Sequence, residues 1–273
     1  MRELIAAMCA AGLEPVKLPE LYDGQLVRFR VAGDKSGSRN GWVVLHRHPE
    51  PVGIFGSWKT GESHAWRMTS DRPMSPEDRA RQRAQILQAQ KVRAEAESQM
   101  RADSKARAER LWNVARPASN DHPYLRAKQV PAYGLRLLRE SLVIPVRSAD
   151  GELHTLQFIG PDGEKRFLTG GRVVGCYFAI GRPSDSLLLA EGYATAATLF
   201  AATGMATAAC FNCGNLEPVA RALRAKFPRL RLIVVADNDA FTEGNPGLTK
   251  ARAAARAVGG FLAVPQFKGG YRG

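Results

Sequence analysis

The chain has 273 residues, 45% of them hydrophobic and 24% charged, which is enough for one large domain or two modest ones and excludes a disordered polypeptide. Its 39 lysines and arginines against 26 acids give a formal charge of +13, which favours a polyanionic partner and indicates nucleic acid more strongly than an anionic membrane. No apolar run approaches the roughly 20 residues of a membrane-spanning helix and the start lacks the pattern of a signal peptide, so we expect a cytoplasmic protein with no membrane partner.

The four cysteines do not predict a metal or redox site. Cys210 and Cys213 form a Cys-x-x-Cys pair, but Cys9 and Cys176 are isolated, and no second pair or close histidine completes a tetrahedral zinc shell. We therefore expect no zinc site and interpret the cysteines as small packing residues in a reducing compartment.

Residues 1–72 predict a small β-rich module. The runs Leu26–Val31 and Trp42–His46 predict two strands joined by a basic, glycine-rich hairpin tip. Behind them, Gly53–Gly61 and Trp66–Arg67 place aromatic residues beside basic ones. Such pairs could stack bases and neutralise phosphates. Tryptophans are also the usual core anchors of small sheets, and we favour that structural role.

Residues 73–116 predict a long, charged helix that links two folded regions. Ser75 is the expected N-cap, followed by a proline and two acids in the first turn. The segment to about Arg116 is rich in Ala, Arg, Gln and Glu and has no sustained heptad, so a coiled coil is not supported. We interpret it as an exposed spacer; a solvated face is favoured over a track for a phosphate backbone.

Residues 117–183 predict a mixed α+β segment. Leu142–Val146 and Leu153–Ile159 flank a turn, so they predict an antiparallel hairpin. A second turn leads into a short strand at Glu164–Leu168, and Val173–Ile180 predicts a further strand.

Residues 184–273 predict alternating strands and helices. The expected strands are Leu187–Ala190, Met205–Ala209, Arg231–Ala236 and Phe261–Val264, and the expected helices are Ala194–Ala202, one that starts after Asn215, and Leu248–Ala257. This alternation predicts a small parallel sheet with helices on both faces.

Acidic residues follow two of these buried strands. Glu191 ends the first run, and Asp237 and Asp239 follow the run that ends at Ala236. Because the carboxyl ends of parallel strands meet at one rim, these carboxylates can converge on a point where Mg²⁺ binds. The alternative is that they only cap helices, but capping does not account for an Asp-x-Asp after an unbroken buried strand.

Lys165 and Arg166 lie on the short strand just before the acidic region. A metal-dependent site that handles phosphates needs cations to balance the remaining negative charge. We therefore expect this dipeptide to contact a nucleoside triphosphate or a phosphate backbone.

The segment Leu188–Ala196, followed by Val234–Asp239 with one strand and two helices between them, resembles the Toprim domain shared by bacterial primases, topoisomerases and some nucleases. Gly163–Leu168, Gly175–Phe178 and Asp121–Leu125 look like the polymerase core that precedes this domain in primases of phages and plasmids. The resemblance implies a Toprim-like sheet preceded by a primase-core segment.

The resemblance covers residues from about 117 to 264 well and the first 70 loosely. This chain departs from the family pattern at Thr195, where many primases carry an acid, and in the longer loop Ala240–Gly247. It also lacks an acidic motif after its last strand, in Pro265–Gly273.

By this resemblance the chain is a DNA primase of the mobile-element type. It implies synthesis of short RNA primers on single-stranded DNA from NTPs, with Mg²⁺ or Mn²⁺. Glu191, Asp237 and Asp239 would be metal ligands, and Glu191 a ligand or general base. The residues implied or expected to contact nucleotide or DNA are Lys165, Arg166, Asn212, Gly214, Asn215 and Lys250.

Two other functions stay open: a DNA-binding Toprim protein without catalysis, and a Toprim nuclease. A topoisomerase is least favoured because no strand-passage domain is evident. The sequence has no helicase motif of the G-x-x-x-x-G-K-[ST] type, so we expect a partner such as a replicative helicase or a relaxase to open the template.

Overall fold

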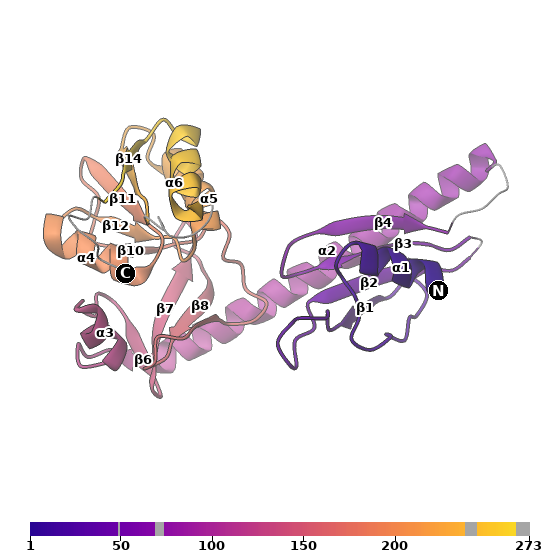
Figure 1. Cartoon of the computed structure of the whole chain (residues 1–273), viewed down its shortest axis with the longest axis horizontal. Coiled ribbons are helices and arrows are strands. Elements are labelled where there is room, and N and C mark those ends of the chain that lie inside the picture. Colours follow the sequence, from indigo (N-terminus) through magenta and orange to yellow (C-terminus); the bar gives the residue numbers. More distant parts are fainter. Residues whose placement is uncertain (49, 69–73, 238–244, 266–273) are drawn as a thin grey trace. The chain divides into compact units, whose positions relative to one another are not determined.

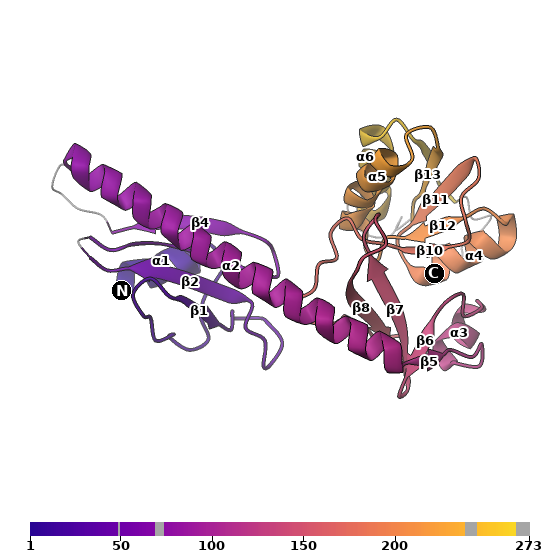
Figure 2. The same cartoon turned by 180° about the vertical axis from the view of Figure 1, so that it is seen from behind.

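A computed structural model describes residues 1–48, 50–68, 74–237 and 245–265 (Figures 1 and 2). The chain divides into two compact units, Met1–Gln99 and Met100–Gly273, and each is described by itself. Within the described ranges, no helix is both long enough and apolar enough to cross a membrane.

The first unit is a four-stranded antiparallel sheet with a helix on each face. Its elements are α1 (Arg2–Ala10), β1 (Leu26–Phe29), β2 (Gly41–His46), β3 (Val52–Ser57), β4 (Ser63–Arg67) and the first part of α2 (Pro76–Val114), with strand order β1-β2-β3-β4. On one face α1 buries Leu4 and Met8 against Val43 and Phe55. On the other, α2 packs through Ala89. Strands β1 and β2 were predicted; β3, β4 and α1 were not predicted as elements.

The three tryptophans of this unit are core residues, as favoured from the sequence. Trp42 is fully buried and packs with Trp58 beneath α2, where the guanidinium of Arg93 lies 5.3 Å from each ring centroid. Trp66 packs against the cluster on the other face, which includes Phe55. These rings are engaged in packing, so the base-stacking alternative is not supported.

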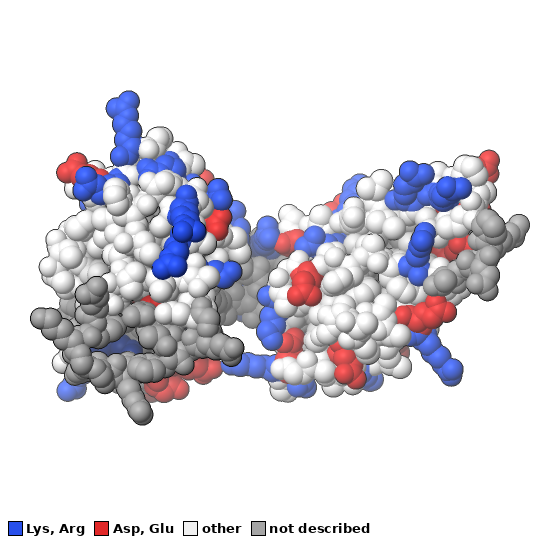
Figure 3. Space-filling model, turned by 45° about the horizontal axis from the view of Figure 1, so that its top comes forward, with Lys and Arg blue, Asp and Glu red and all other residues white. Residues whose placement is uncertain are grey.

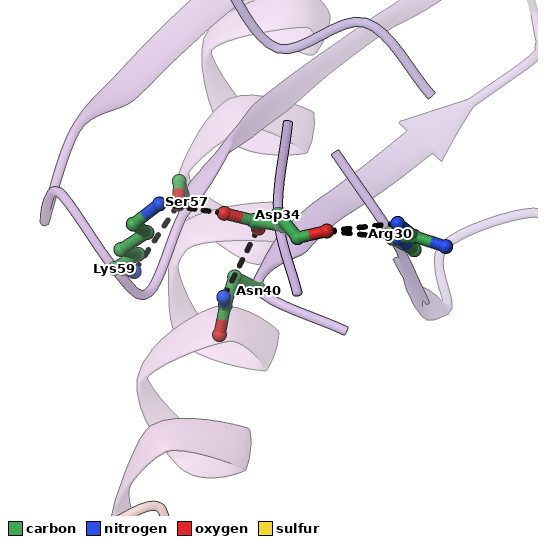
Figure 4. Close-up of polar contacts among 5 residues, drawn as sticks. All are labelled: Arg30, Asp34, Asn40, Ser57 and Lys59. Carbon is green, nitrogen blue, oxygen red and sulfur yellow. Dashed lines mark hydrogen bonds and ion pairs between the residues drawn. The ribbon is translucent and has the colours of Figure 1, made fainter. Parts of the chain in front are cut away.

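The basic loop between β1 and β2 folds around a buried carboxylate (Figure 4). Asp34 is 7% exposed, and its carboxylate accepts hydrogen bonds from Lys59 Nζ at 2.7 Å and Asn40 Nδ2 at 3.0 Å. The Arg30 guanidinium donates to the Asp34 carbonyl at 2.9 Å. The hydrogen bond from Lys59 is the main reason that the pKa of Asp34 lies below its usual range. The loop is therefore cross-linked to the turn after β3 and to the residue that follows β1.

Helix α2 is one continuous helix of 39 residues, as predicted. The N–H of Asp78 donates to Ser75 Oγ at 3.1 Å, which confirms the predicted N-cap. The interpretation as an exposed spacer is wrong at both ends, because Ala89 is buried in the first unit and Ala108 in the second. Alanine lets the helix approach a sheet closely, so few large apolar residues are needed.

The second unit contains two five-stranded sheets. The first has the order β5-β6-β7-β8-β9 and is antiparallel; its elements are β5 (Arg116–Pro117), α3 (Pro123–Lys128), β6 (Arg136–Leu138), β7 (Ser141–Arg147), β8 (Leu153–Ile159) and β9 (Lys165–Phe167). The predicted hairpin is β7–β8. One face packs on the end of α2 through Val143 and Leu156, and the other faces α4 through Ile144 and Ile159.

The second sheet has the order β10-β12-β11-β13-β14, and all its strands but β10 are parallel. Its elements are β10 (Phe178–Ile180), β11 (Ser186–Ala190), α4 (Tyr193–Thr203), β12 (Thr207–Ala209), α5 (Leu216–Lys226), β13 (Arg231–Val235), α6 (Pro246–Ala257) and β14 (Phe261–Ala263). Helix α4 covers one face and α5 and α6 the other, as Figure 1 shows. The predicted parallel α/β fold is confirmed.

The strand predicted over Val173–Ile180 is shorter than expected, because only β10 pairs within the second sheet, while Tyr177 forms an isolated bridge with Arg147. The side chain of Asn215 donates to the carbonyls of Val173 and Cys176 and accepts from the N–H of Gly175. These bonds hold the segment before β10 as a loop against the start of α5.

Candidate active site

Two acids lie at the carboxyl ends of neighbouring parallel strands. Strands β11 and β13 pair with Leu189 opposite Val234. Glu191 comes two residues after Leu189, and Asp237 comes three residues after Val234. Both acids are half-buried. The register therefore brings them to one edge of the sheet, as predicted. Asp239, the third predicted acid, lies outside the described residues.

Lys165 brings a cation to this edge from the other sheet. It pairs with Ile159 of β8, and paired residues of an antiparallel ladder share a face, so Lys165 is on the face that packs toward α4. Its Nζ lies 3.8 Å from the place that a Cβ on Gly192, the residue after Glu191, would occupy. The ammonium is therefore close to the acidic edge.

Arg166 is on the opposite face of β9. It pairs with Phe158, and its guanidinium carbon lies 4.9 Å from the centroid of that ring. The basic dipeptide predicted from the sequence is thus divided between two faces. Only Lys165 lies beside the acids in this structure.

Phe167 and Phe211 form an aromatic contact at this edge that sequence reasoning missed. Their rings meet edge to face with centroids 5.8 Å apart. Phe211 has a φ of 76°, a left-handed conformation that costs energy for a residue with a side chain. The contact holds β9 against the loop after β12. The one signal in the sequence was a phenylalanine next to the basic pair, which alone does not indicate a partner.

The loop after β12 carries Asn212, Gly214 and Asn215. Asn212 and Gly214 are exposed, and the Asn212 side chain accepts from the Asn215 N–H at 3.0 Å. Asn215 is 3% exposed, and its side chain is committed to backbone groups, including the Cys210 carbonyl at 2.8 Å. This favours a structural role for Asn215 and leaves Asn212 and Gly214 accessible.

Lys250 is exposed on α6, the helix that comes after β13 in the chain. Asn245 caps this helix by accepting the Leu248 N–H at 3.2 Å. Lys250 therefore lies about one turn from the N-terminus of α6.

The donor atoms at the edge suit a hard divalent cation. Carboxylate oxygens are the ligands that Mg²⁺ and Mn²⁺ prefer. Burial, with a smaller effect from Glu191, raises the pKa of Cys210, so its thiol stays protonated and does not compete as a ligand. Among the residues that the structure describes, no three His, Cys, Asp or Glu side chains gather in a metal-binding group, and the third predicted ligand is not among those residues.

The second sheet matches a known protein family. Residues 186–265, from the start of β11 to just past β14, match the Toprim domain family. This segment is a Toprim domain. Glu191 and Asp237 are therefore the acids at the carboxyl edge of the Toprim sheet, and Lys165 reaches that edge from the segment that precedes the domain.

The sequence similarity extends beyond the Toprim domain. The chain is 37% identical over 265 residues to a DNA primase TraC of Escherichia coli, across 92% of this chain and 25% of that protein. A second DNA primase TraC of Escherichia coli is 36% identical across 90% of this chain and 18% of its own length. The chain thus spans about a quarter or less of these relatives.

Solved structures similar to the chain include the primase fragment of the bacteriophage T7 primase-helicase protein, with 12% identity, a TM-score of 0.41 and coverage of 55% of this chain and 69% of that one. The DnaG primase catalytic domain bound to ssDNA has 14% identity and a TM-score of 0.41, across 61% of this chain and 71% of that one.

Proposed function

We propose that the chain is a DNA primase that joins NTPs into short RNA primers on single-stranded DNA. The observation that carries the proposal is the edge of the Toprim domain, where Glu191 and Asp237 follow the carboxyl ends of neighbouring strands and Lys165 approaches from β9. The identity to DNA primase TraC supports it. A replicative helicase or a relaxase is the proposed partner that opens the template.

We propose Glu191, Asp237 and Asp239 as ligands of a divalent cation, Mg²⁺ or Mn²⁺. When bound, such a cation supplies Lewis-acid polarisation of the phosphoryl group and stabilises charge on the departing pyrophosphate. In this proposal Glu191 is a ligand or the base that takes the proton from the attacking hydroxyl.

The chain's own residues position and balance the triphosphate. Lys165 attracts it and offsets negative charge that the carboxylates alone would repel. Helix α4 begins at Tyr193 directly after Gly192, so its free N–H groups and positive end favour an anion at the same place. We propose Asn212 and Gly214 as nucleotide contacts and Lys250 as a contact to the template backbone. Asn215 is assigned to supporting the loop.

The test is a gel assay of labelled products on single-stranded templates, with each NTP omitted in turn and with Mg²⁺ or Mn²⁺. Asp237→Asn should lower primer synthesis by at least about 10²-fold, as is typical for loss of a group that stabilises transition-state charge. Asp185→Asn is the matched control, because this exposed acid directly precedes β11 and so lies at the opposite end of that strand from Glu191.

Full synthesis by Asp237→Asn would contradict the assignment. Cleavage of supplied DNA without new product would indicate a Toprim nuclease. DNA binding with no product under either metal would indicate a protein that binds DNA without catalysis.

A further inference from the structure

We propose that the second unit has a groove, away from the candidate active site, that binds single-stranded nucleic acid. The groove is a row of three adjoining hollows whose main residues are Trp112, Arg147, Tyr177, Lys226, Phe227 and Arg229. We call it the Arg147 groove.

The hollows are joined by the residues they share. The central one has a volume of about 360 Å³ and lies between the end of α2, β7, β10 and the end of α5. A second, also about 360 Å³, shares Trp112, Arg147 and Gly151 with it. A third, of about 320 Å³, shares Lys226. The volume of each hollow is near the lower limit for a small-ligand pocket. A single nucleotide would therefore occupy one hollow, whereas a strand would occupy the whole row.

Each hollow is lined by at least one aromatic ring and at least one cation. Trp112 and Arg147 line both the central and the second hollow, Tyr177 and Lys226 also line the central one, and Lys226, Phe227 and Arg229 line the third. Proteins bind single strands in this way, with cations along the backbone and rings against the bases. The side chains are held in place: Arg136 lies 4.3 Å from the Trp112 ring centroid, and the Lys226 ammonium lies 5.4 Å from the Phe227 ring centroid and donates to the Ala149 carbonyl.

The central hollow contains a polar group without a partner. Ser148 lines it and is 7% exposed, and its Oγ has no hydrogen-bond partner among the residues that the structure describes. A buried hydroxyl without a partner is costly, and a phosphate or sugar oxygen would satisfy it. Arg147 stands next to it, and its guanidinium is held by the Gly151 carbonyl at 2.9 Å.

The charge around the groove suits a polyanion. Two acids, Glu109 and Glu152, line only the outer hollow, and Glu152 is bound by Lys105. Burial raises the pKa of Tyr177, and the negative charge of Asp150 raises it further. Besides Lys226, helices α5 and α6 carry five basic residues and one acid, and Figure 3 shows more blue than red over them. A single strand leaving the groove would therefore meet further positive charge.

The Arg147 groove shares no lining residue with the acidic edge of the Toprim domain. The proposal therefore does not depend on catalysis, and it assigns a separate contact for the template or the product strand. Its failure and that of the primase proposal are distinguishable, because Asp237→Asn should keep the binding that the groove provides.

The experiment measures binding of a labelled 20-nucleotide single strand by fluorescence anisotropy over a salt series, with no divalent metal. Lys226→Ala with Arg229→Ala removes two exposed cations of the groove. Arg126→Ala with Lys128→Ala removes two exposed cations of α3 and is the matched control. The groove variant should bind about tenfold more weakly, and its log–log salt slope should fall by about 1.4, since each phosphate contact to a single strand contributes about 0.7. The control should match the parent chain.

A second readout locates the strand without changing the protein. Cross-linking of 5-iodouracil DNA followed by peptide mapping should give adducts at Trp112, Tyr177 or Phe227. Equal weakening in the two double variants, or adducts only outside the groove, would overturn the proposal. The proposal would also be overturned if ATP displaced the strand and if ATP itself bound the groove variant more weakly than the parent chain. The groove would then be a site for free nucleotides.

Discussion

Replacing Asn215 by alanine should strongly destabilise the second unit. The side chain accepts the Gly175 N–H at 2.8 Å and donates to the carbonyls of Cys176 at 2.9 Å and Cys210 at 2.8 Å, with a longer bond to Val173 at 3.2 Å. Alanine leaves these groups in a site that is 3% exposed, where water cannot replace the amide. At about 1–3 kcal/mol for each buried group left unpaired, and with relaxation recovering part of it, the cost should be about 4 kcal/mol. That is a large part of a typical domain's stability.

The assay is urea unfolding combined with native-state hydrogen exchange, since exchange of β10 and β12 reports on the second unit separately. Asn212→Ala is the matched control from the same loop: it removes an exposed cap and should cost about 1 kcal/mol. Asn215→Asp should be at least as harmful as Asn215→Ala, because a carboxylate would face carbonyl oxygens. The reasoning would be refuted by an Asn215→Ala protein no less stable than Asn212→Ala, or by protection of β10 and β12 that is unchanged.

Three further predictions concern single contacts. Lys165→Ala should lower primer synthesis by about 10²–10³-fold, whereas Arg166→Ala, whose side chain faces away, should change it little; equal losses would contradict the division of the pair. Gly53→Ala should destabilise the first unit by about 3 kcal/mol in thermal unfolding, because the new Cβ would lie 2.3 Å from a backbone oxygen of β2. The depressed pKa of Asp34 means that its stabilising effect is present at neutral pH and is lost below about pH 4 as the folded-state carboxylate becomes protonated. Asp34→Asn or Lys59→Met should flatten that acid limb of the stability curve, and an unchanged limb would exclude this carboxylate as its cause.

The strands and helices of the Toprim domain could be predicted to within two residues at most ends. Short apolar runs such as Leu187–Ala190 are bounded by glycine, acids or prolines, so the sequence indicates where each strand ends. The edge position of Glu191 and Asp237 followed from the parallel order alone. Asp239 stays a prediction.

What could not be predicted depended on contacts between distant segments. The opposite directions of Lys165 and Arg166 follow from the predicted strand itself. That Lys165, and not Arg166, faces the acids follows from the pairing of β9 with β8, which no local pattern specifies. The strand predicted at Val173 was lost to a side chain 42 residues away. Helix α1 was missed, although Leu4 and Met8 are spaced to share one helical face.

The short strand β9 raises a question of alignment during folding. It is an edge strand of three residues, and a slip by one residue would exchange the faces of its two cations, so a positive charge would still reach the acids. The presence of a cation beside the acids therefore does not by itself select one register of the backbone pairing. The slip would, however, remove Phe167 from Phe211. The ring contact thus favours the register in which the Lys165 ammonium, and not the Arg166 guanidinium, lies on the face toward the acids.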